Sequence, residues 1–494
     1  MMNVANMVFI KTIKKKIDLR TILLLVIFLT TLRVIIDWAL LDYPIEINIF
    51  QDFIRFYLEN LYYFLIIFLL LSFLISKIVG KKLINVMNFC IRFFPIIITP
   101  PLIDFFFFNR TEGYNYATID NFFYNFLTLS ILRGDASHGI NMVVVLVFLF
   151  VFLYVFYIKR SILLSIFAGF LTSLVVVIIS TPDLFFGEGM GDYYYDFFLP
   201  TYYFFPLLFL SILLCYYYKK EKLKAILSNL RVLKSMMFVS VTILGSLAAA
   251  SFGYSINPFK TLLAAIVPFF GWQFSIVVND IYDYNIDKLT NKDRPLVKKA
   301  LTVEDYKFVA LIFAFFALSF STILNLQIFL LTILGLVLGV IYSVPPIRLR
   351  RHFVGNLVMG ISLVISFTIG FLIANDINSI FNSKNYVFIF LLLLFGTLIT
   401  FTKDIKDIKS DSKYDVKNFY TVYGKEKGKK IVTILLFIVL NLPTLLLKDF
   451  TILPITIIFS SLTCWIYYKK EDEKVVYIMS ALLGIYIFMN LYYF

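Results

Sequence analysis

Long apolar runs, each about as long as a membrane-spanning helix, recur along the whole chain between short polar segments. A helix needs about 20 apolar residues to cross the hydrocarbon core of a bilayer. Runs of this kind predict spans near residues 21–41, 53–76, 88–108, 140–158, 161–180, 199–217, 236–252, 260–278, 306–323, 327–343, 353–374, 386–402, 430–447, 450–467 and 474–493. The pattern therefore predicts an all-α, polytopic membrane protein with about 15 transmembrane helices.

The composition strengthens this prediction. Hydrophobic residues make up 61% of the chain, aromatic residues 19% and charged residues 15%, whereas soluble domains have about 25% charged residues. The net charge of +14 raises the question of a nucleic-acid partner. Lysine and arginine cluster in short loops between the apolar runs, as expected for loops that stay in the cytoplasm. We therefore expect the lipid bilayer as a partner and no nucleic acid.

The distribution of basic residues also predicts the topology. Basic clusters precede the first run and follow the second, fourth and sixth runs, whereas the intervening loops are acidic. The positive-inside rule then places the N-terminus in the cytoplasm and returns the chain there after six spans. The basic segment KKEKLKAILSNLRVLKS, residues 219–235, separates two differently patterned halves. We predict a six-helix domain of unknown role over residues 1–225 and a nine-helix domain over residues 226–494 of a multi-pass cell-membrane protein, with the C-terminus outside.

Two aspartate triplets with identical spacing follow two of the predicted spans at their cytoplasmic ends. They are Asp280, Asp283 and Asp287, and then Asp404, Asp407 and Asp411. Positions i, i+3 and i+7 share one face of a helix. Six carboxylates brought together without counterions would repel each other, so the pattern predicts cations between them. Mg²⁺ prefers oxygen ligands and often binds carboxylates together with substrate phosphates. Solvated helix ends are the alternative, which suits one triplet better than two.

Arginines lie between the two triplets. KDRPL carries Arg294, and YSVPPIRLRR carries Arg348, Arg350 and Arg351. Because a guanidinium group stays charged and binds phosphate oxygens in a bidentate manner, these residues are candidates for holding a diphosphate. Positive-inside anchoring is the competing explanation, and we expect it to account for at least two of them.

Together these segments resemble the UbiA superfamily of intramembrane prenyltransferases. The motifs are NDxxDxxxD at residues 279–287, DRP at 293–295, YSxPPxRLRR at 342–351 and DxxDxxxD at 404–411. The resemblance covers about residues 230–494. It implies a helical bundle with a central cavity, two Mg²⁺ ions, and transfer of a prenyl group from a prenyl diphosphate to a lipid-soluble or amphipathic acceptor.

The resemblance also implies roles for individual residues. Asn279 with Asp280, Asp283 and Asp287 would form the first metal and diphosphate motif, and Asp404, Asp407 and Asp411 the second. Tyr342 would join Asn279 and the four arginines in binding the diphosphate. The chain departs from many family members at Val297–Lys299 and at Asn418–Tyr420, which leaves the acceptor open.

Three alternatives follow for the function. We favour a prenylated glycerol phosphate of ether-lipid synthesis as the acceptor, because KDIKDIKSD resembles that branch best. An aromatic acid of quinone synthesis is a second candidate acceptor. A cation-coupled transporter is the rival from a different class, although it would be expected to carry its carboxylates nearer the middle of the membrane.

Overall fold

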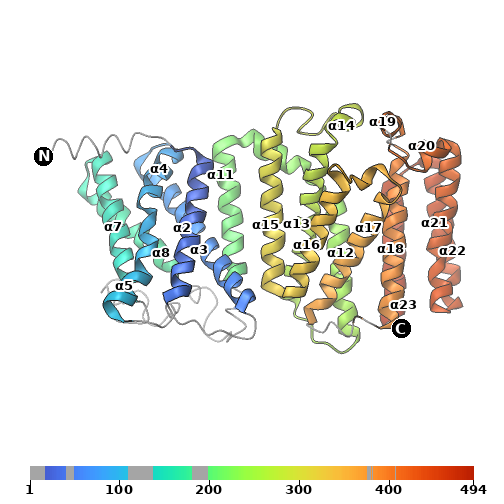
Figure 1. Ribbon diagram of the computed structural model, residues 1–494, viewed down its shortest axis with the longest axis horizontal. Helices are drawn as coiled ribbons and strands as arrows, with labels where there is room; N and C mark the ends of the chain where they lie inside the picture. The colour runs from blue at the N-terminus through green and yellow to red at the C-terminus, as the bar shows by residue number, and fades with distance from the viewer. Residues whose placement is uncertain are drawn as a thin grey trace. The chain divides into compact units, whose positions relative to one another are not determined.

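The computed structural model describes residues 17–40, 49–109, 137–180, 199–374, 380, 382–406, 408–414 and 416–493. Over these residues the secondary structure is helical, without strands, and 15 helices are long and apolar enough to cross a membrane (Figure 1). The predicted all-α, polytopic class and the predicted number of spans are confirmed. The chain forms two compact units, Met1–Tyr217 and Tyr218–Phe494.

The first unit packs its helices around a core of small and branched aliphatic side chains. Its elements are α2 (Leu19–Leu40), α3 (Ile49–Val79), α4 (Leu83–Phe93), η1 (Phe94–Ile98), α5 (Thr99–Phe108), α7 (His138–Lys159), α8 (Ile162–Ile179) and the start of α11 (Leu199–Asn229). Val79, Val86, Val151, Val155 and Ala168 belong to its core. The third predicted span is divided into α4, η1 and α5, where Pro95 stands, because proline has no N–H group for the helical hydrogen bond.

The second unit contains the helices that carry the motifs. Its elements are α12 (Val232–Ser251), α13 (Pro258–Tyr282), α14 (Tyr284–Thr290), α15 (Val303–Leu324), α16 (Leu326–Ser343), η4 (Leu349–Arg351), α17 (Gly355–Phe371), η5 (Leu372–Ala374), α18 (Ser383–Asp404), α19 (Ile408–Lys413), α20 (Phe419–Tyr423), α21 (Lys425–Leu447), η7 (Phe450–Ile452), α22 (Leu453–Lys470) and α23 (Glu473–Tyr492). Among the described residues, nine of these helices have the length and hydropathy of a span.

Side-chain caps fix where several of these spans begin. Asn257 accepts hydrogen bonds from the first backbone N–H groups of α13, and Asn325 and Asn382 do the same for α16 and α18. Thr302 and Asp305 form a reciprocal capping box on α15. Such caps satisfy backbone donors that have no partner within the helix. They therefore set the register with which α13 and α18 deliver the acidic motifs at their other ends.

Glycines bring α12, α17 and α18 close together. A Cβ atom at Gly245 would collide with the backbone oxygen of Phe367, and one at Gly370 with that of Thr242. Gly360 of α17 and Gly396 of α18 pack in the same way. Small residues let transmembrane helices approach at the backbone, where van der Waals packing and hydrogen bonds stabilise their association. These three helices supply several side chains of the candidate active site.

Candidate active site

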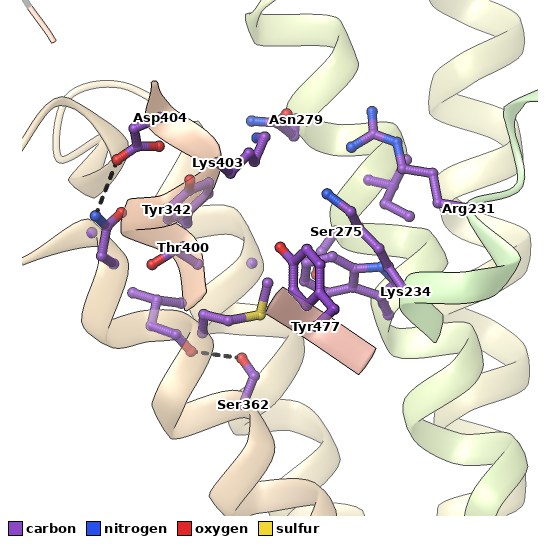
Figure 2. Close-up of a pocket in the computed structure, with 17 residues that line it drawn as sticks. Arg231, Lys234, Ser275, Asn279, Tyr342, Ser362, Thr400, Lys403, Asp404 and Tyr477 are labelled. Carbon is purple, nitrogen blue, oxygen red and sulfur yellow. Dashed lines mark hydrogen bonds between the residues drawn. The ribbon is translucent and has the colours of Figure 1, made fainter. Parts of the chain in front are cut away.

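A cavity of about 100 Å³ lies among α12, α13, α16, α17, α18 and α23 in the second unit (Figure 2). Asn279 of the first acidic motif and Asp404 of the second both line it, as does Tyr342. The remaining wall combines cations, polar groups and apolar side chains, including Arg231, Lys403 and Met359. Residues from both motifs therefore border one space.

The first acidic motif lies where one helix ends and the next begins. The α13 helix ends at Tyr282 and α14 starts at Tyr284, so Asp283 stands at the break. Asp280, Asp283 and Asp287 are nevertheless all buried, with exposed fractions of 1%, 1% and 3%. Asn279 is half-buried and donates a hydrogen bond from Nδ2 to Ser343 Oγ at 3.4 Å.

Arginine and asparagine side chains surround Asp280 and Asp287. Asp280 accepts hydrogen bonds from Asn229 Nδ2 at 3.0 Å and from an Arg231 guanidinium nitrogen at 2.7 Å, and it is also ion-paired with Arg294. Arg294 lies 3.2 Å from the second carboxylate, Asp287, which also accepts a hydrogen bond from Asn291. Arg294 of the DRP segment thus bridges two motif carboxylates.

The loop after α16 supplies the counterions of Asp283. Arg348 donates hydrogen bonds to Asp283 Oδ1 at 3.0 Å and to the backbone oxygen of Tyr282 at 3.1 Å, and Arg350 also forms an ion pair with Asp283. Arg348 has a φ of 39°, a left-handed conformation that is uncommon for residues other than glycine and tends to occur at functional sites. Burial lowers the pKa of the Arg348 guanidinium from its usual value. Arg351, by contrast, is exposed.

The second acidic motif has neutral hydrogen-bond donors beside its carboxylates. Asp404 is the last residue of α18 and accepts a hydrogen bond from Asn356 Nδ2 at 3.3 Å (Figure 2). Asp411 lies in α19, is 3% exposed, and accepts a hydrogen bond from Asn418 Nδ2 at 2.9 Å. Asp407 lies outside the described residues.

The two motifs meet at the same end of the bundle. Helices α14 and α19 contact each other there (Figure 1), and the Tyr414 hydroxyl donates a hydrogen bond to the backbone oxygen of Asn285 at 3.3 Å. The sequence predicts metal cations between the carboxylates of the two motifs. The structure pairs the carboxylates of the first motif with arginines, because a buried carboxylate without a partner is strongly unfavourable.

The donor set suits a hard divalent cation, since buried aspartate oxygens are the ligands that Mg²⁺ prefers. Within the described residues, no three His, Cys, Asp or Glu side chains are gathered closely enough to hold a metal ion. Arginines form ion pairs with the three carboxylates of the first motif. The carboxylates therefore have the chemistry of metal ligands. A metal ion bound to the first motif would have to displace the arginines from these carboxylates.

Sequence reasoning missed several residues of this site. Arg231 and Lys234 belong to the basic segment that was interpreted only as a topological signal, and Lys403 directly precedes the second motif. Trp272 and Tyr477 also line the cavity. Lysine and arginine at a membrane boundary serve as anchors so often that the sequence offers no separate signal of a binding role.

Comparison with known proteins agrees with the resemblance. Residues 237–476 match the UbiA prenyltransferase family. The chain is 28% identical over 213 residues to the digeranylgeranylglyceryl phosphate synthase of Methanosphaera stadtmanae, covering 43% of this chain and 72% of that protein. It is 30% identical over 200 residues to the probable homogentisate phytyltransferase 2, chloroplastic, of Oryza sativa subsp. japonica, covering 37% of this chain and 52% of the rice protein.

A solved structure of a UbiA homolog from Archaeoglobus fulgidus bound to DMAPP and Mg²⁺ is 19% identical, with a TM-score of 0.41, and it covers 54% of this chain and 99% of the homolog. The family match and the sequence identity to curated relatives agree with the motifs at residues 279–287 and 404–411. Residues 237–476 of this chain therefore form a UbiA prenyltransferase family domain.

Proposed function

We propose that the second unit transfers a prenyl group, within the membrane, from a prenyl diphosphate to a lipid-soluble or amphipathic acceptor. The observation that carries the proposal is that Asn279 of one acidic motif and Asp404 of the other border the same cavity. Arg231 and Lys403 add positive charge to the same wall. A space with both acidic motifs and cations at its border suits a diphosphate leaving group.

The proposal includes a requirement for Mg²⁺, with two ions expected. One would be held by Asn279, Asp280, Asp283 and Asp287, and the other by Asp404, Asp407 and Asp411. Divalent ions at these positions would neutralise the negative charge that develops on the leaving diphosphate.

The protein's own side chains would orient the donor and protect the reacting carbon. Arg294, Arg348 and Arg350 already lie beside the first motif and present donors that match diphosphate oxygens. The allylic C–O bond of the donor breaks, and its electron pair leaves with the diphosphate. The acceptor oxygen then forms the new C–O bond and loses its proton. Trp272, Ile276 and Met359 line the cavity and would keep water from the reactive carbon.

A second, apolar cavity supports the hydrocarbon part of the proposal. It has a volume of about 50 Å³ and shares Trp272, Ser275 and Ser362 with the first cavity. Gly271 and Gly335 also line it, and a Cβ atom at either glycine would meet nothing within 4 Å. A prenyl chain that starts at the first cavity would find an apolar, uncrowded continuation here.

A prenylated glycerol phosphate is the acceptor we favour. Relatives in Methanosphaera stadtmanae and Sulfurisphaera tokodaii are both digeranylgeranylglyceryl phosphate synthases. Similarity to the rice phytyltransferase keeps an aromatic acid as the second candidate. The position of Asp404 at the last residue of α18 supports a transferase over a transporter, because a transporter's carboxylates would be expected nearer the membrane midplane.

The test uses the purified full chain in lipid nanodiscs with geranylgeranyl diphosphate as donor. Acceptors are a prenylated glycerol phosphate and an aromatic acid, each with Mg²⁺ and with EDTA. We expect diphosphate release and an ether product by mass spectrometry, only with Mg²⁺. Folded protein that releases no diphosphate with either acceptor in Mg²⁺ would contradict the proposed function.

A further inference from the structure

Two buried hydrogen-bond donors without a partner line the candidate cavity. They are the indole N–H group of Trp272 and the hydroxyl group of Tyr477. Leaving such donors without an acceptor costs free energy, and nearly all buried polar groups in proteins are hydrogen-bonded. Two of them at the border of one cavity indicate a ligand that brings acceptor atoms.

The charges around the cavity indicate that this ligand is an anion. Arg231, Lys234 and Lys403 are cations among the lining residues, and Asp404 is their carboxylate counterpart. The Lys234 ammonium group lies 5.5 Å from the centre of the Tyr477 ring. Lys234 and one of the two donors therefore face the same part of the cavity.

This part of the cavity lies apart from the Asp404 carboxylate of the second acidic motif. Figure 2 shows Lys234 and Tyr477 together, on the side of the cavity away from Asp404. Arg231, three residues before Lys234, is directed to Asp280 instead, at 2.7 Å. Arg231, just before α12, thus lies beside the first acidic motif, and Lys234, in the first turn of α12, lies beside Tyr477. This arrangement suits a site that holds two different anions.

We infer that Lys234, Trp272 and Tyr477 bind the phosphate group of the acceptor. This inference rests on the proposed function, in which the donor's diphosphate binds at the acidic motifs. The acceptor's phosphate is then the second anion of the cavity. A lysine ammonium group, an indole N–H and a phenol O–H together supply up to five donors. A phosphate monoester has three terminal oxygens to accept them, whereas a carboxylate has two. Lys234 and Tyr477 lie outside residues 237–476, so the family match assigns them no role.

The experiment compares Tyr477→Phe, Trp272→Phe and Lys234→Gln with the unmodified full chain. Each variant is assayed with geranylgeranyl diphosphate and either a prenylated glycerol phosphate or the same lipid without its phosphate. We expect each substitution to raise KM for the phosphate-bearing acceptor about tenfold, as for loss of one hydrogen bond to a charged group. In Tyr477→Phe and Lys234→Gln, KM for the donor and for the phosphate-free acceptor should stay within about twofold of the unmodified protein.

Two further measurements separate the possible failures. Calorimetric titration of the phosphate-bearing acceptor without donor reports its affinity independently of turnover, and it should weaken about tenfold in Tyr477→Phe. Tyr486→Phe changes another tyrosine of α23 that is not among the cavity-lining residues, and it should leave acceptor affinity unchanged. If the unmodified protein turns over no acceptor, the proposed function fails. If it does, and Tyr477→Phe and Lys234→Gln keep their KM for the phosphate-bearing acceptor or lose donor affinity instead, this inference alone is wrong.

Discussion

Asp280 shows how the individual residues of the site depend on each other. Its carboxylate contacts Asn229 and Arg231, from the segment before α12, and Arg294, from the DRP segment. Asp404, by contrast, has an amide donor, Asn356, in hydrogen-bond contact. Asparagine at either position keeps the shape of the side chain but removes its negative charge. At Asp280 this charge balances the arginines, and at both positions a bound metal ion would need it.

We predict that Asp280→Asn and Asp404→Asn each lower diphosphate release at least a hundredfold, equivalent to about 2.7 kcal/mol of transition-state stabilisation. Both variants should still elute as monodisperse protein in detergent. Glu426→Gln is the matched control, because Glu426 is an exposed carboxylate in the first turn of α21. Activity within about tenfold of the unmodified enzyme in both aspartate variants would refute the metal assignment.

The carboxyl group of Glu471 provides a test of stability against pH. Hydrogen bonds from Lys429, at 2.8 Å, and from Lys425 lower the pKa of Glu471 below its usual value. A lowered carboxyl pKa stabilises the fold above the ordinary value of 4.5, and this stabilisation is lost as the pH falls through the lowered pKa. Lys429 is only 8% exposed, so loss of its partner is unfavourable.

We therefore predict that Glu471→Gln lowers the free energy of unfolding by about 1 kcal/mol at pH 7. Thermal unfolding in detergent would show a lower Tm for the variant at pH 7, and this difference in Tm would shrink as the pH falls below 4.5. A difference in Tm that stayed constant as the carboxyl groups became protonated would show that the ion pair is not its cause.

At the scale of helices, the sequence predicted all 15 spans but not their interruptions. The spans are apolar on every side, so hydrophobic periodicity marks their presence and gives little information on their ends. The α13 helix breaks at Asp283, and α11 continues to Asn229 through a non-helical Lys219. The partners of the acidic motif were also hidden, because Arg348 and Asp283 are 65 residues apart in sequence and only the packed bundle brings them together.

Gly271 of α13 and Gly335 of α16 line the second cavity and allow a test of where the prenyl chain binds. Leucine at Gly271 or Gly335 would project into the second cavity without meeting a neighbour at its Cβ atom, and would fill space that the prenyl chain needs. We predict that Gly271→Leu and Gly335→Leu raise KM for geranylgeranyl diphosphate about tenfold, a loss of about 1.4 kcal/mol. KM for dimethylallyl diphosphate should stay within about twofold.

The control for this prediction is Gly484→Leu. Gly484 lies on α23, does not line either cavity, and also has no atom within 4 Å of an added Cβ. It should not change the preference between long and short donors. An unchanged preference in the two cavity variants would place the prenyl chain elsewhere.

At the scale of the whole molecule, the orientation in the membrane remains a prediction from the basic loops. We expect the acidic motifs to face the cytoplasm. Cysteines placed at Lys288 and Lys413, both exposed, in a chain whose native cysteines are replaced by alanine, should react only with a membrane-permeant reagent in right-side-out vesicles. Labelling of either position by an impermeant reagent would reverse the predicted topology.

The first unit is expected to be dispensable for donor turnover, and the contacts of the second unit define how much chain must remain. Lys222 pairs with Asp305 at 2.5 Å, and Asn229 and Arg231 contact Asp280. Lys222, Asn229 and Arg231 lie before α12, so the second unit needs residues that precede the first of its nine spans. The basic residues of this segment would also hold a new N-terminus in the cytoplasm.

We predict that a truncation starting at Glu221 inserts correctly and releases diphosphate in Mg²⁺ at a rate within about tenfold of the full chain. A second truncation starting at Val232 is the matched control, since it keeps every span of the second unit but removes Asn229 and Arg231. It should lose most of this activity, because Asp280 then loses two of its partners and the cavity loses a cation. If the longer truncation gives a monodisperse peak in detergent yet no donor turnover, the first unit must help to build the active site.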